Sequence, residues 1–428
     1  MPFEFGLVSP RKVAVIGGGV SGLSAAEHLS RDNHVTLFEA DKRLGGHART
    51  IIAGKNADQP VDTGFIVYNY RNYPHLTAMF ERLDVPVKKS DMSFGVSVKG
   101  GKLEYSLNTL NSIFGQRSNL CSVNFYKLIR DIVHFNNHSG AMVDGTDLTL
   151  RDLLAELGTG NWHRDYYILP FAGAIWSTPL EKMLDFPADA LMRFFKNHGL
   201  LSHKEHLQWY TVDGGSIEYV SRLERQLRTQ NVTIRRGAEV TGVKRGERGV
   251  QIKLKGGTWQ GFDDVVFACH SDQALKMMVD PSQTEAALLG AIKYQPNRAV
   301  LHADNSVMPK RKRVWSAWNY VADETPRTEP VGVTYWMNKL QSIPEQDPIF
   351  QSLNPVREIR EELIYDQKEF MHPVFDAAAM KAQTKIRAIQ GQRNTWFCGA
   401  YLKNGFHEDG YASAVDMAKL FERQAAWA

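Results

Sequence analysis

Residues 13–22 read VAVIGGGVSG, a run of β-forming residues that stops at a cluster of glycines and is followed by a helix-like segment. The spacing Gly17-x-Gly19-x-x-Gly22 is typical of a strand–turn–helix unit that holds a pyrophosphate. In such a unit Gly17 permits the tight turn, Gly19 lets the backbone approach a phosphate, and Gly22 lets the helix pack on the strand. The stretch therefore predicts a Rossmann-like α/β domain that binds a dinucleotide.

The residues after the glycines supply the rest of such a site. A helix-like segment, residues 23–29, follows, and its N-terminus would offer N–H groups and a positive dipole end to a phosphate. Val20 and Ser21, in the glycine cluster before it, are also expected to contact the cofactor. Residues 35–38 (VTLF) predict a second strand. It ends at Glu39, about 20 residues beyond the glycines, where a carboxylate accepts hydrogen bonds from an adenosine ribose; Ala40 lies beside it. An ordinary glycine turn is the weaker interpretation, because strand, helix, second strand and acidic end occur together.

A second glycine pair distinguishes a flavin nucleotide from a nicotinamide nucleotide. Gly45 and Gly46 lie between Arg43 and Arg49, which adds close backbone approach and cationic donors for a diphosphate. A plain NAD domain does not need this second cluster. We therefore expect FAD as the cofactor.

The combination of Glu39 with Arg43, Gly45 and Gly46 resembles the flavin-containing amine oxidase and phytoene desaturase superfamily. In that superfamily an acidic strand end followed by an R-x-G-G box is a characteristic FAD motif. His47 departs from the pattern, since many members have arginine there. The resemblance implies a GR2-type FAD-binding domain and a separate substrate domain.

The resemblance also assigns cofactor contacts further along the chain. Residues 61–69 (VDTGFIVYN) carry a D-x-G motif, after which the backbone runs beside the isoalloxazine ring in the superfamily. The apolar run alone would equally fit a buried strand. Residues 395–414 match the closing strand, flavin loop and helix, with Ala414 where many relatives have glycine. The additional positions implied to contact FAD are Gly64, Phe65, Ile66, Val240, Ala268, Gly399, Gly410, Tyr411 and Ser413.

Length and composition set the class of protein. The 428 residues can form two domains, and 23% charged with 43% hydrophobic residues is ordinary for a globular enzyme. A net charge of +4 is too small to indicate nucleic-acid binding. The sequence lacks a signal-peptide pattern and a run of about 18 apolar residues. The 3 cysteines have neither metal-ligand spacing nor a disulfide framework, which favours a cytoplasmic location.

We expect the FAD-binding domain to be discontinuous, with residues 10–75, 214–278 and 385–428. Residues 76–213 and 279–384 would form the α+β substrate-binding domain. Within that domain, residues 149–152 (TLRD) resemble a capping box that opens a helix ending at Gly158. Alternation along Trp315, Ala317 and Asn319 predicts a strand that places these three side chains on one face.

Four segments resemble a bacterial subgroup of these flavoproteins associated with modification of membrane fatty acids. They are residues 62–69 (DTGFIVYN), 174–177 (AIWS), 372–375 (HPVF) and 405–410 (GFHEDG). One branch of the subgroup is linked to desaturation of a methylated acyl chain, and the subgroup distantly resembles FAD-dependent fatty acid isomerases. The resemblance therefore implies a lipid or fatty-acyl substrate that is desaturated by hydride transfer to the flavin. A redox-neutral double-bond isomerase, an amine oxidase and a non-catalytic lipid-binding flavoprotein remain alternatives.

Candidate catalytic residues near the flavin are Tyr68, Trp176, His407 and Glu408. His407 can exchange protons near neutral pH, although a loop histidine is more often a hydrogen-bonding scaffold. Glu408 and Asp409 are expected mainly to cap the following helix, and Tyr68 and Trp176 to shape the pocket. No Ser/His/Asp arrangement or metal-ligand spacing stands out, so we expect neither a hydrolase nor a metal site.

A basic run, residues 310–313 (KRKR), lies beside Trp315 and Trp318. It is a candidate for peripheral contact with anionic lipid headgroups, while a solvated loop is the more ordinary interpretation. The sequence carries no pattern that indicates an oligomeric state.

Overall fold

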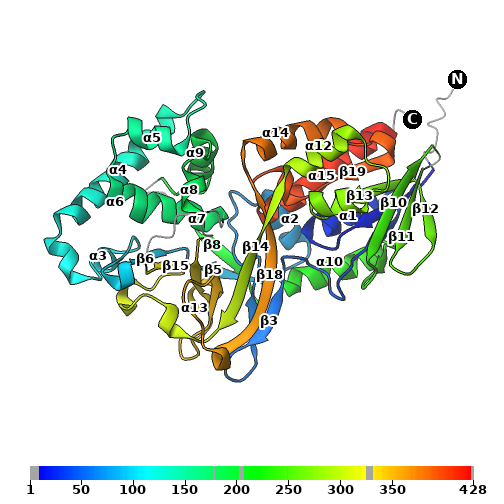
Figure 1. Cartoon of the computed structure of the whole chain (residues 1–428). Helices are drawn as coiled ribbons and strands as arrows, with labels where there is room; N and C mark the ends of the chain where they lie inside the picture. Colours follow the sequence, from blue (N-terminus) through cyan, green and yellow to red (C-terminus); the bar gives the residue numbers. More distant parts are fainter. Residues whose placement is uncertain (1–8, 177–178, 202–206, 248, 324–330, 426–428) are drawn as a thin grey trace.

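The computed structural model describes residues 9–176, 179–201, 207–247, 249–323 and 331–425. Two parts lie side by side: an α/β part that contains both ends of the described chain, and a larger part in which a lobe of helices covers a mixed sheet (Figure 1). Ser177, the last residue of one subgroup segment, lies outside the described residues.

A five-stranded parallel sheet forms the centre of the α/β part, in the order β19-β13-β1-β2-β9. Its strands are β1 (Lys12–Ile16), β2 (His34–Phe38), β9 (Thr233–Arg235), β13 (Asp264–Phe267) and β19 (Thr395–Phe397). They come from three separated stretches of sequence, residues 12–38, 233–267 and 395–397. Val13, Ala14 and Val15 are fully buried, because a parallel sheet is covered on both faces.

Helices and a small antiparallel sheet cover this parallel sheet. The helices include α1 (Val20–Leu29), α10 (Ile217–Thr229) and α15 (His407–Ala425); the small sheet has β10 (Val240–Gly246), β11 (Gly249–Leu254) and β12 (Trp259–Phe262). The additional helices packed here are α2 (Pro74–Arg82), α11 (Ser271–Met277), α12 (Gln283–Ala291) and α14 (Ala377–Ile386). The boundaries expected at residues 75, 278 and 385 therefore fall inside this core, since α2, α12 and α14 bury their apolar faces against it.

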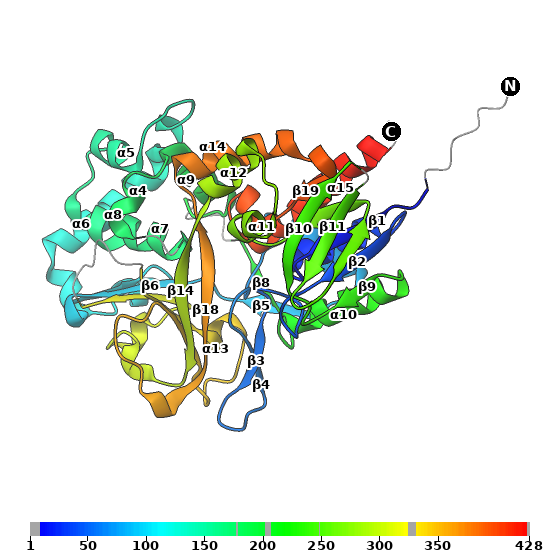
Figure 2. The same cartoon turned by 45° about the vertical axis from the view of Figure 1, so that its right-hand side comes forward.

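The second part is built on a seven-stranded sheet, in the order β18-β14-β17-β16-β15-β6-β7. Its strands are β6 (Phe94–Val98), β7 (Leu103–Ser106), β14 (Lys293–His302), β15 (Trp318–Ala322), β16 (Val333–Trp336), β17 (Phe350–Leu353) and β18 (Ile364–Val374). The long antiparallel pair β18 and β14 forms one end of this sheet, on the side of the α/β part, which is visible in both views (Figures 1 and 2).

A lobe of helices packs over this sheet. It contains α3 (Leu110–Ile113), α4 (Val123–Met142), α5 (Leu150–Glu156), α6 (Asn161–His163), α7 (Leu169–Trp176), α8 (Leu180–Met183) and α9 (Ala188–Asn197). The remaining elements are β3 (Thr50–Ala53), β4 (Gln59–Asp62), β5 (Val87–Ser90), β8 (Trp209–Val212) and α13 (Met337–Leu340). No helix in the described ranges has an apolar stretch long enough to cross a bilayer.

Of the two local predictions made for this part, the capping box at residues 149–152 is correct and the strand beginning at Trp315 is not. The capping box is confirmed: the Thr149 hydroxyl accepts from the Asp152 N–H, α5 follows, and Gly158 has φ +63° just beyond its end. The prediction that Trp315, Ala317 and Asn319 lie on one face of a single strand is wrong. Trp315 follows a 3₁₀ turn at residues 312–314, and β15 begins only at Trp318. The Trp315 indole instead donates to the Pro309 carbonyl.

Candidate functional site

The first glycine turn is shaped by contacts within the protein at two of its glycines. Gly17 has φ +110°, and a Cβ there would lie 2.7 Å from the Ala268 carbonyl oxygen. A Cβ on Gly22 would lie 1.7 Å from the carbonyl oxygen of Gly17, so only glycine lets α1 pack this closely on the end of β1. Gly19 differs, because the nearest atom to a Cβ there is the Gly46 Cα at 3.9 Å. The free volume at Gly19 fits the approach of a phosphate.

The second glycine pair packs directly against this turn. The Gly45 N–H donates to the Gly18 carbonyl at 2.8 Å, and a Cβ on Gly46 would lie 3.1 Å from the Gly19 Cα. The Arg43 guanidinium donates to the carbonyls of Gly46 and Ala48, at 2.7 and 3.1 Å. Arg43 thus holds the second loop in place against the first through its backbone.

The two arginines beside this pair were expected to be donors for a diphosphate. Arg43 makes the backbone bonds just described. Arg49 forms a bidentate pair with Asp366 of β18, at 2.5 and 3.0 Å, and contacts Thr63. Both guanidinium groups are engaged by protein oxygens, and Arg49 links the nucleotide loops to the substrate sheet.

Two helix N-termini meet at the glycine turn. The N-cap of α1 is Gly19, which offers no side chain to the first N–H groups of the helix. A Cβ on Gly410, in the first turn of α15, would lie 2.8 Å from the Val20 side chain and 2.9 Å from that of Ser21. Two positive dipole ends therefore converge where a pyrophosphate would bind, and the first N–H groups of α1 have no side-chain cap.

The carboxylate of Glu39, at the end of β2, is fixed by backbone N–H groups in a position to accept hydrogen bonds from a ribose. Glu39 accepts from the N–H groups of Gly18 and Asp41, at 2.6 and 2.7 Å. These bonds fix the carboxylate beside the glycine turn, with lone pairs left for ribose hydroxyls. Ala40 follows it on the surface, and Val240 lies buried at the start of β10.

The closing helix shows which of its residues can face a cofactor. Gly399 donates its N–H to the Ser413 hydroxyl at 2.8 Å, so that hydroxyl ties β19 to α15. The Tyr411 hydroxyl donates to Glu27 at 2.7 Å in the interface between α1 and α15. The side chain of Tyr411 is therefore occupied inside the protein, and only its backbone remains to serve the site.

The predicted flavin loop connects β4 to α2. A Cβ on Gly64 would lie 1.9 Å from the His47 carbonyl, and the Phe65 N–H donates to that carbonyl at 2.9 Å. The Phe65 ring stacks on His407 with centroids 4.0 Å apart, and Ile66 is partly exposed beside it. This loop therefore brings the second glycine loop and the start of α15 together.

His407 is a neutral scaffold in this arrangement. Its Nε2 shares a hydrogen bond of 2.6 Å with the Tyr219 hydroxyl. Burial, with a smaller contribution from His47, lowers the pKa of His407 to about 3. An imidazole with that pKa is a weak base at neutral pH, which favours the scaffold interpretation over proton exchange.

The two carboxylates after His407 cap two different helices. Glu408 accepts from the N–H groups of His75 and Leu76, at 3.0 and 2.9 Å, at the start of α2. Asp409 accepts from the Phe406 N–H at 2.9 Å at the start of α15. The expected cap of the following helix is thus correct for Asp409 and wrong for Glu408. Burial raises the pKa of Glu408 to about 7, which the two N–H donors oppose.

Tyr68 and Trp176 are packing residues in different cores. Tyr68 is fully buried, with its ring 5.1 Å from that of Phe80 in α2, and burial raises the pKa of its hydroxyl. Trp176 ends α7 and lies 4.8 Å from the ring of Phe194. Phe194 in turn stacks on Phe406, so Trp176 connects the helical lobe to the start of α15.

Two features of the site were not predicted from the sequence. Asp62 accepts from the N–H and hydroxyl of Ser216 and from the hydroxyl of Thr50, which fixes the start of α10 against β4. His47 also meets two histidines from distant segments, with ring centroids 6.1 Å from His270 and 5.7 Å from His372. No sequence signal could have joined these groups, because they lie far apart along the chain.

The histidine cluster carries no positive charge at neutral pH. Burial lowers the pKa of His47 and His270 to about 4 and that of His372 to about 3. Within the described ranges, no group of three or more His, Cys, Asp or Glu side chains is arranged to hold a metal ion.

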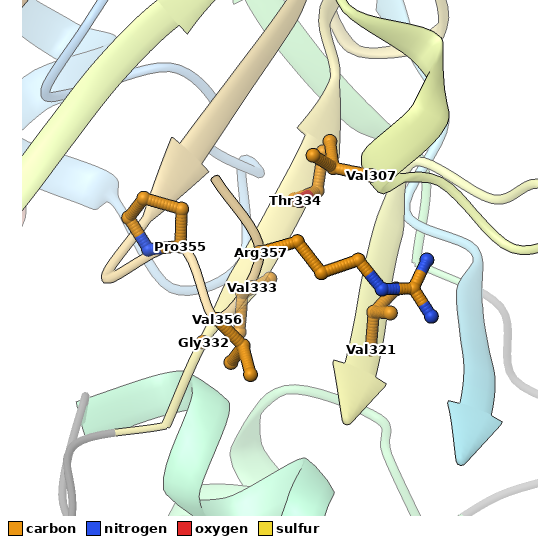
Figure 3. A pocket seen from close by; sticks show the side chains of 8 residues that line it. All are labelled: Val307, Val321, Gly332, Val333, Thr334, Pro355, Val356 and Arg357. Atoms are coloured by element: carbon orange, nitrogen blue, oxygen red, sulfur yellow. The ribbon is translucent and has the colours of Figure 1, made fainter. Parts of the chain in front are cut away.

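A small pocket lies elsewhere, on the seven-stranded sheet (Figure 3). Valine side chains such as Val307 and Val321 line it, and Arg357 crosses it. The Arg357 guanidinium is paired with Asp323 at 2.6 Å, so its charge is already matched.

Comparison with known proteins gives the family. The model of the family described as flavin containing amine oxidoreductase matches residues 20–347, more than three quarters of the chain. The chain belongs to this family. As a flavin containing amine oxidoreductase it is an FAD-dependent enzyme. The two glycine loops at residues 17–22 and 45–46, which we call the nucleotide cradle, fit that cofactor together with Glu39 and the N-termini of α1 and α15.

Individual relatives differ in their named activities. Coproporphyrinogen III oxidase of Mycobacterium tuberculosis is 39% identical over 80 residues, 18% of this chain and 17% of the relative. The chain spans at most 17% of the length of the curated relatives it matches. The fatty acid isomerase of P. acnes that produces CLA has TM-score 0.66 and 16% identity, covering 96% of this chain and 98% of that one. Cyclohexylamine oxidase of Brevibacterium oxydans has TM-score 0.62 and 15% identity, covering 97% and 100%. These two structures show the fold alone.

Proposed function

We propose that this flavin containing amine oxidoreductase dehydrogenates the acyl chain of a lipid, forming a double bond in a methylated or unsaturated fatty acyl group. The FAD would accept a hydride at its reactive nitrogen. The remaining proton leaves to water. The residues of the chain would hold the acyl chain and keep charged side chains away from it.

The observation that carries this proposal is a set of partly exposed apolar side chains on the flavin loop, on α7 of the helical lobe and just before α15. These side chains also pack on the core of the lobe. They are Ile66, Val67, Phe171, Ile175, Trp176 and Phe406. Large apolar side chains that stay partly exposed in a substrate domain suit a hydrocarbon ligand. The stack from Trp176 through Phe194 to Phe406 connects the part of this set on α7 with the part just before α15.

Charge around the flavin loop and the start of α15 favours a neutral group over a cationic amine. Asp62, Glu408 and Asp409 all accept hydrogen bonds from protein N–H or O–H groups. The nearby imidazoles of His47 and His407 have lowered pKa values and are neutral at pH 7. A protonated amine would find no uncommitted carboxylate among these groups, whereas an acyl chain requires none.

A redox-neutral isomerase is the second candidate. With His407 a weak base and Glu408 committed to α2, neither group is suited to take a proton during turnover. Returning the hydride to another carbon of the same chain would need no such acceptor. The fold shared with the fatty acid isomerase of P. acnes is consistent with this alternative.

Anaerobic mixing of the FAD-loaded protein with candidate ligands separates these functions. Lasting bleaching of the flavin by a methylated or unsaturated fatty acyl lipid supports dehydrogenation. Movement of a double bond without lasting bleaching supports the isomerase, and tight binding without either supports a carrier. Bleaching by simple amines, with peroxide formed once oxygen is admitted, overturns the proposal in favour of an amine oxidase.

A pair of matched variants tests whether these apolar side chains contact the substrate during the reaction. Ile175→Asp places a carboxylate among the apolar side chains and should slow flavin reduction by an acyl lipid at least tenfold, because a buried charge is costly beside a hydrocarbon. Ile52→Asp makes the same change at an exposed position of β3 and should leave the rate unchanged. Equal rates in the two variants would contradict this contact.

A further inference from the structure

Exposed apolar side chains gather at the outer end of the helical lobe. Leu110 begins α3 and is 78% exposed, and Val123 begins α4 and is 69% exposed. Between them in sequence lies Leu120, 48% exposed, whose carbonyl accepts from the Tyr126 hydroxyl at 3.1 Å. We call these four residues the lobe tip. Large side chains this exposed are unusual on a surface that meets only water.

The two helices of the lobe tip are joined to each other and to the basic run. The ring of Phe114, at the end of α3, lies 6.1 Å from that of Tyr126 in α4. A Cβ on Gly115 would lie 2.5 Å from Val314 and 3.6 Å from Arg313, so the chain after α3 rests on the turn at residues 312–314. Figure 1 shows α3 at the edge of the molecule farthest from the chain termini.

Basic side chains surround the lobe tip. Residues 99–131 contain five cations, Lys99, Lys102, Arg117, Lys127 and Arg130, and two anions, Glu104 and Asp131. The Arg130 guanidinium is paired with Asp131 at 2.7 Å, which leaves four of the five cations. Glu104 is fully buried and paired with Arg311 at 2.7 Å, so it does not offset the exposed charge. Lys310, Lys312 and Arg313 add three exposed cations.

We propose that the lobe tip docks on an anionic lipid bilayer. Apolar side chains at the starts of helices would enter the interface while lysines and arginines contact acidic headgroups, and Tyr126 combines an apolar ring with a polar hydroxyl. A second copy of the chain fits less well, because a two-fold contact would bring the same cations face to face. The two tryptophans beside the basic run pack within the protein. Trp315 packs on Trp336 and Phe350, and Trp318 on Tyr335.

This proposal is independent of the reaction at the flavin, since docking needs no turnover. Cosedimentation of the FAD-loaded protein with phosphatidylcholine vesicles, with and without phosphatidylglycerol, measures it directly. We expect tight binding only to the anionic vesicles, and weaker binding as salt is raised. Absence of binding to anionic vesicles overturns the proposal whatever the substrate is.

Two double variants test the surface. Lys312→Gln with Arg313→Gln should weaken vesicle binding about thirtyfold, since each basic residue near an anionic surface contributes about a factor of five. The matched control Lys244→Gln with Lys419→Gln removes two exposed charges from the α/β part and should bind like the unaltered protein. Equal weakening by the two pairs would overturn the assignment of the surface.

Leu110→Ser with Val123→Ser should also weaken binding at least tenfold, because it removes the apolar side chains that would be buried. Its control, Ile52→Ser with Val279→Ser, changes two similarly exposed residues elsewhere. Sedimentation velocity decides the competing explanation. The lobe tip would instead be assigned to contact with a second copy if three results were found together. The unaltered protein would be a dimer, it would not bind vesicles, and the Leu110→Ser, Val123→Ser variant would be a monomer.

Discussion

Replacing Gly19 by alanine separates the two demands on the glycine turn, packing within the protein and approach of a phosphate. Gly19 has φ −75° and ψ −176°, a conformation that alanine adopts readily, and a Cβ there would meet no protein atom closer than 3.9 Å. The unfolding free energy of the protein without FAD should therefore fall by less than about 1 kcal/mol, the usual range for a weaker N-cap. The methyl group would instead occupy the space of the phosphate.

The expected loss appears in FAD binding. Displacing the phosphate by a methyl group removes one charge-assisted N–H bond, worth about 1.5–3 kcal/mol. FAD affinity should fall about 10- to 150-fold, as measured by quenching of flavin fluorescence. Gly22→Ala is the contrasting variant: its Cβ would lie 1.7 Å from the Gly17 carbonyl, so it should destabilise the protein without FAD by about 3 kcal/mol or more.

Thermal unfolding of both variants, with and without FAD, checks these numbers. The reasoning is refuted if Gly19→Ala binds FAD as tightly as the unaltered protein. It is equally refuted if Gly19→Ala and Gly22→Ala lose the same stability in the absence of FAD. Gly140→Ala, at an open position within α4, is the control and should be neutral or slightly stabilising.

Four further substitutions at three positions test individual contacts. Glu408→Ala should lower the unfolding free energy by about 1–3 kcal/mol because it leaves two N–H groups at the start of α2 without an acceptor, and Glu408→Gln should recover part of the loss in thermal unfolding. His407→Phe should keep turnover within about tenfold, since the imidazole is a poor base; a loss of about 100-fold or more, as expected on removal of a general base, would contradict this. Asp62 has its pKa raised to about 6 by burial, so the folded state binds the proton more tightly than the unfolded state. The unaltered protein should therefore gain up to about 3 kcal/mol relative to Asp62→Asn as pH falls from 7 to 4, and parallel unfolding curves would argue against that shift.

The nucleotide cradle could be predicted from the sequence because its determinants are local. The strand, Gly17, Gly22 and the carboxylate of Glu39 lie within one short stretch, and each has a steric or hydrogen-bonding reason to occur there. The same holds for the capping box at Thr149. Glycine spacing and helix caps depend on residues that are close together in sequence, so sequence patterns can predict them.

The contacts that organise the catalytic side were not predictable, because they join residues that only the tertiary fold brings together. Tyr219 meets His407 across 188 positions of sequence, and Arg49 meets Asp366 across 317. The role of Glu408 was misassigned for the same reason, since its partner helix α2 begins more than 300 residues earlier. The strand expected at Trp315 was wrong because alternation alone does not reveal the preceding 3₁₀ turn.

Mass spectrometry of membrane lipids from cells with and without this gene tests the central claim most directly. If the enzyme dehydrogenates an acyl chain, cells with the gene should contain a lipid lighter by two hydrogen atoms than one that accumulates without it. An unchanged set of acyl chains, with the purified FAD-loaded enzyme reduced by amines but not by lipids, would contradict the account.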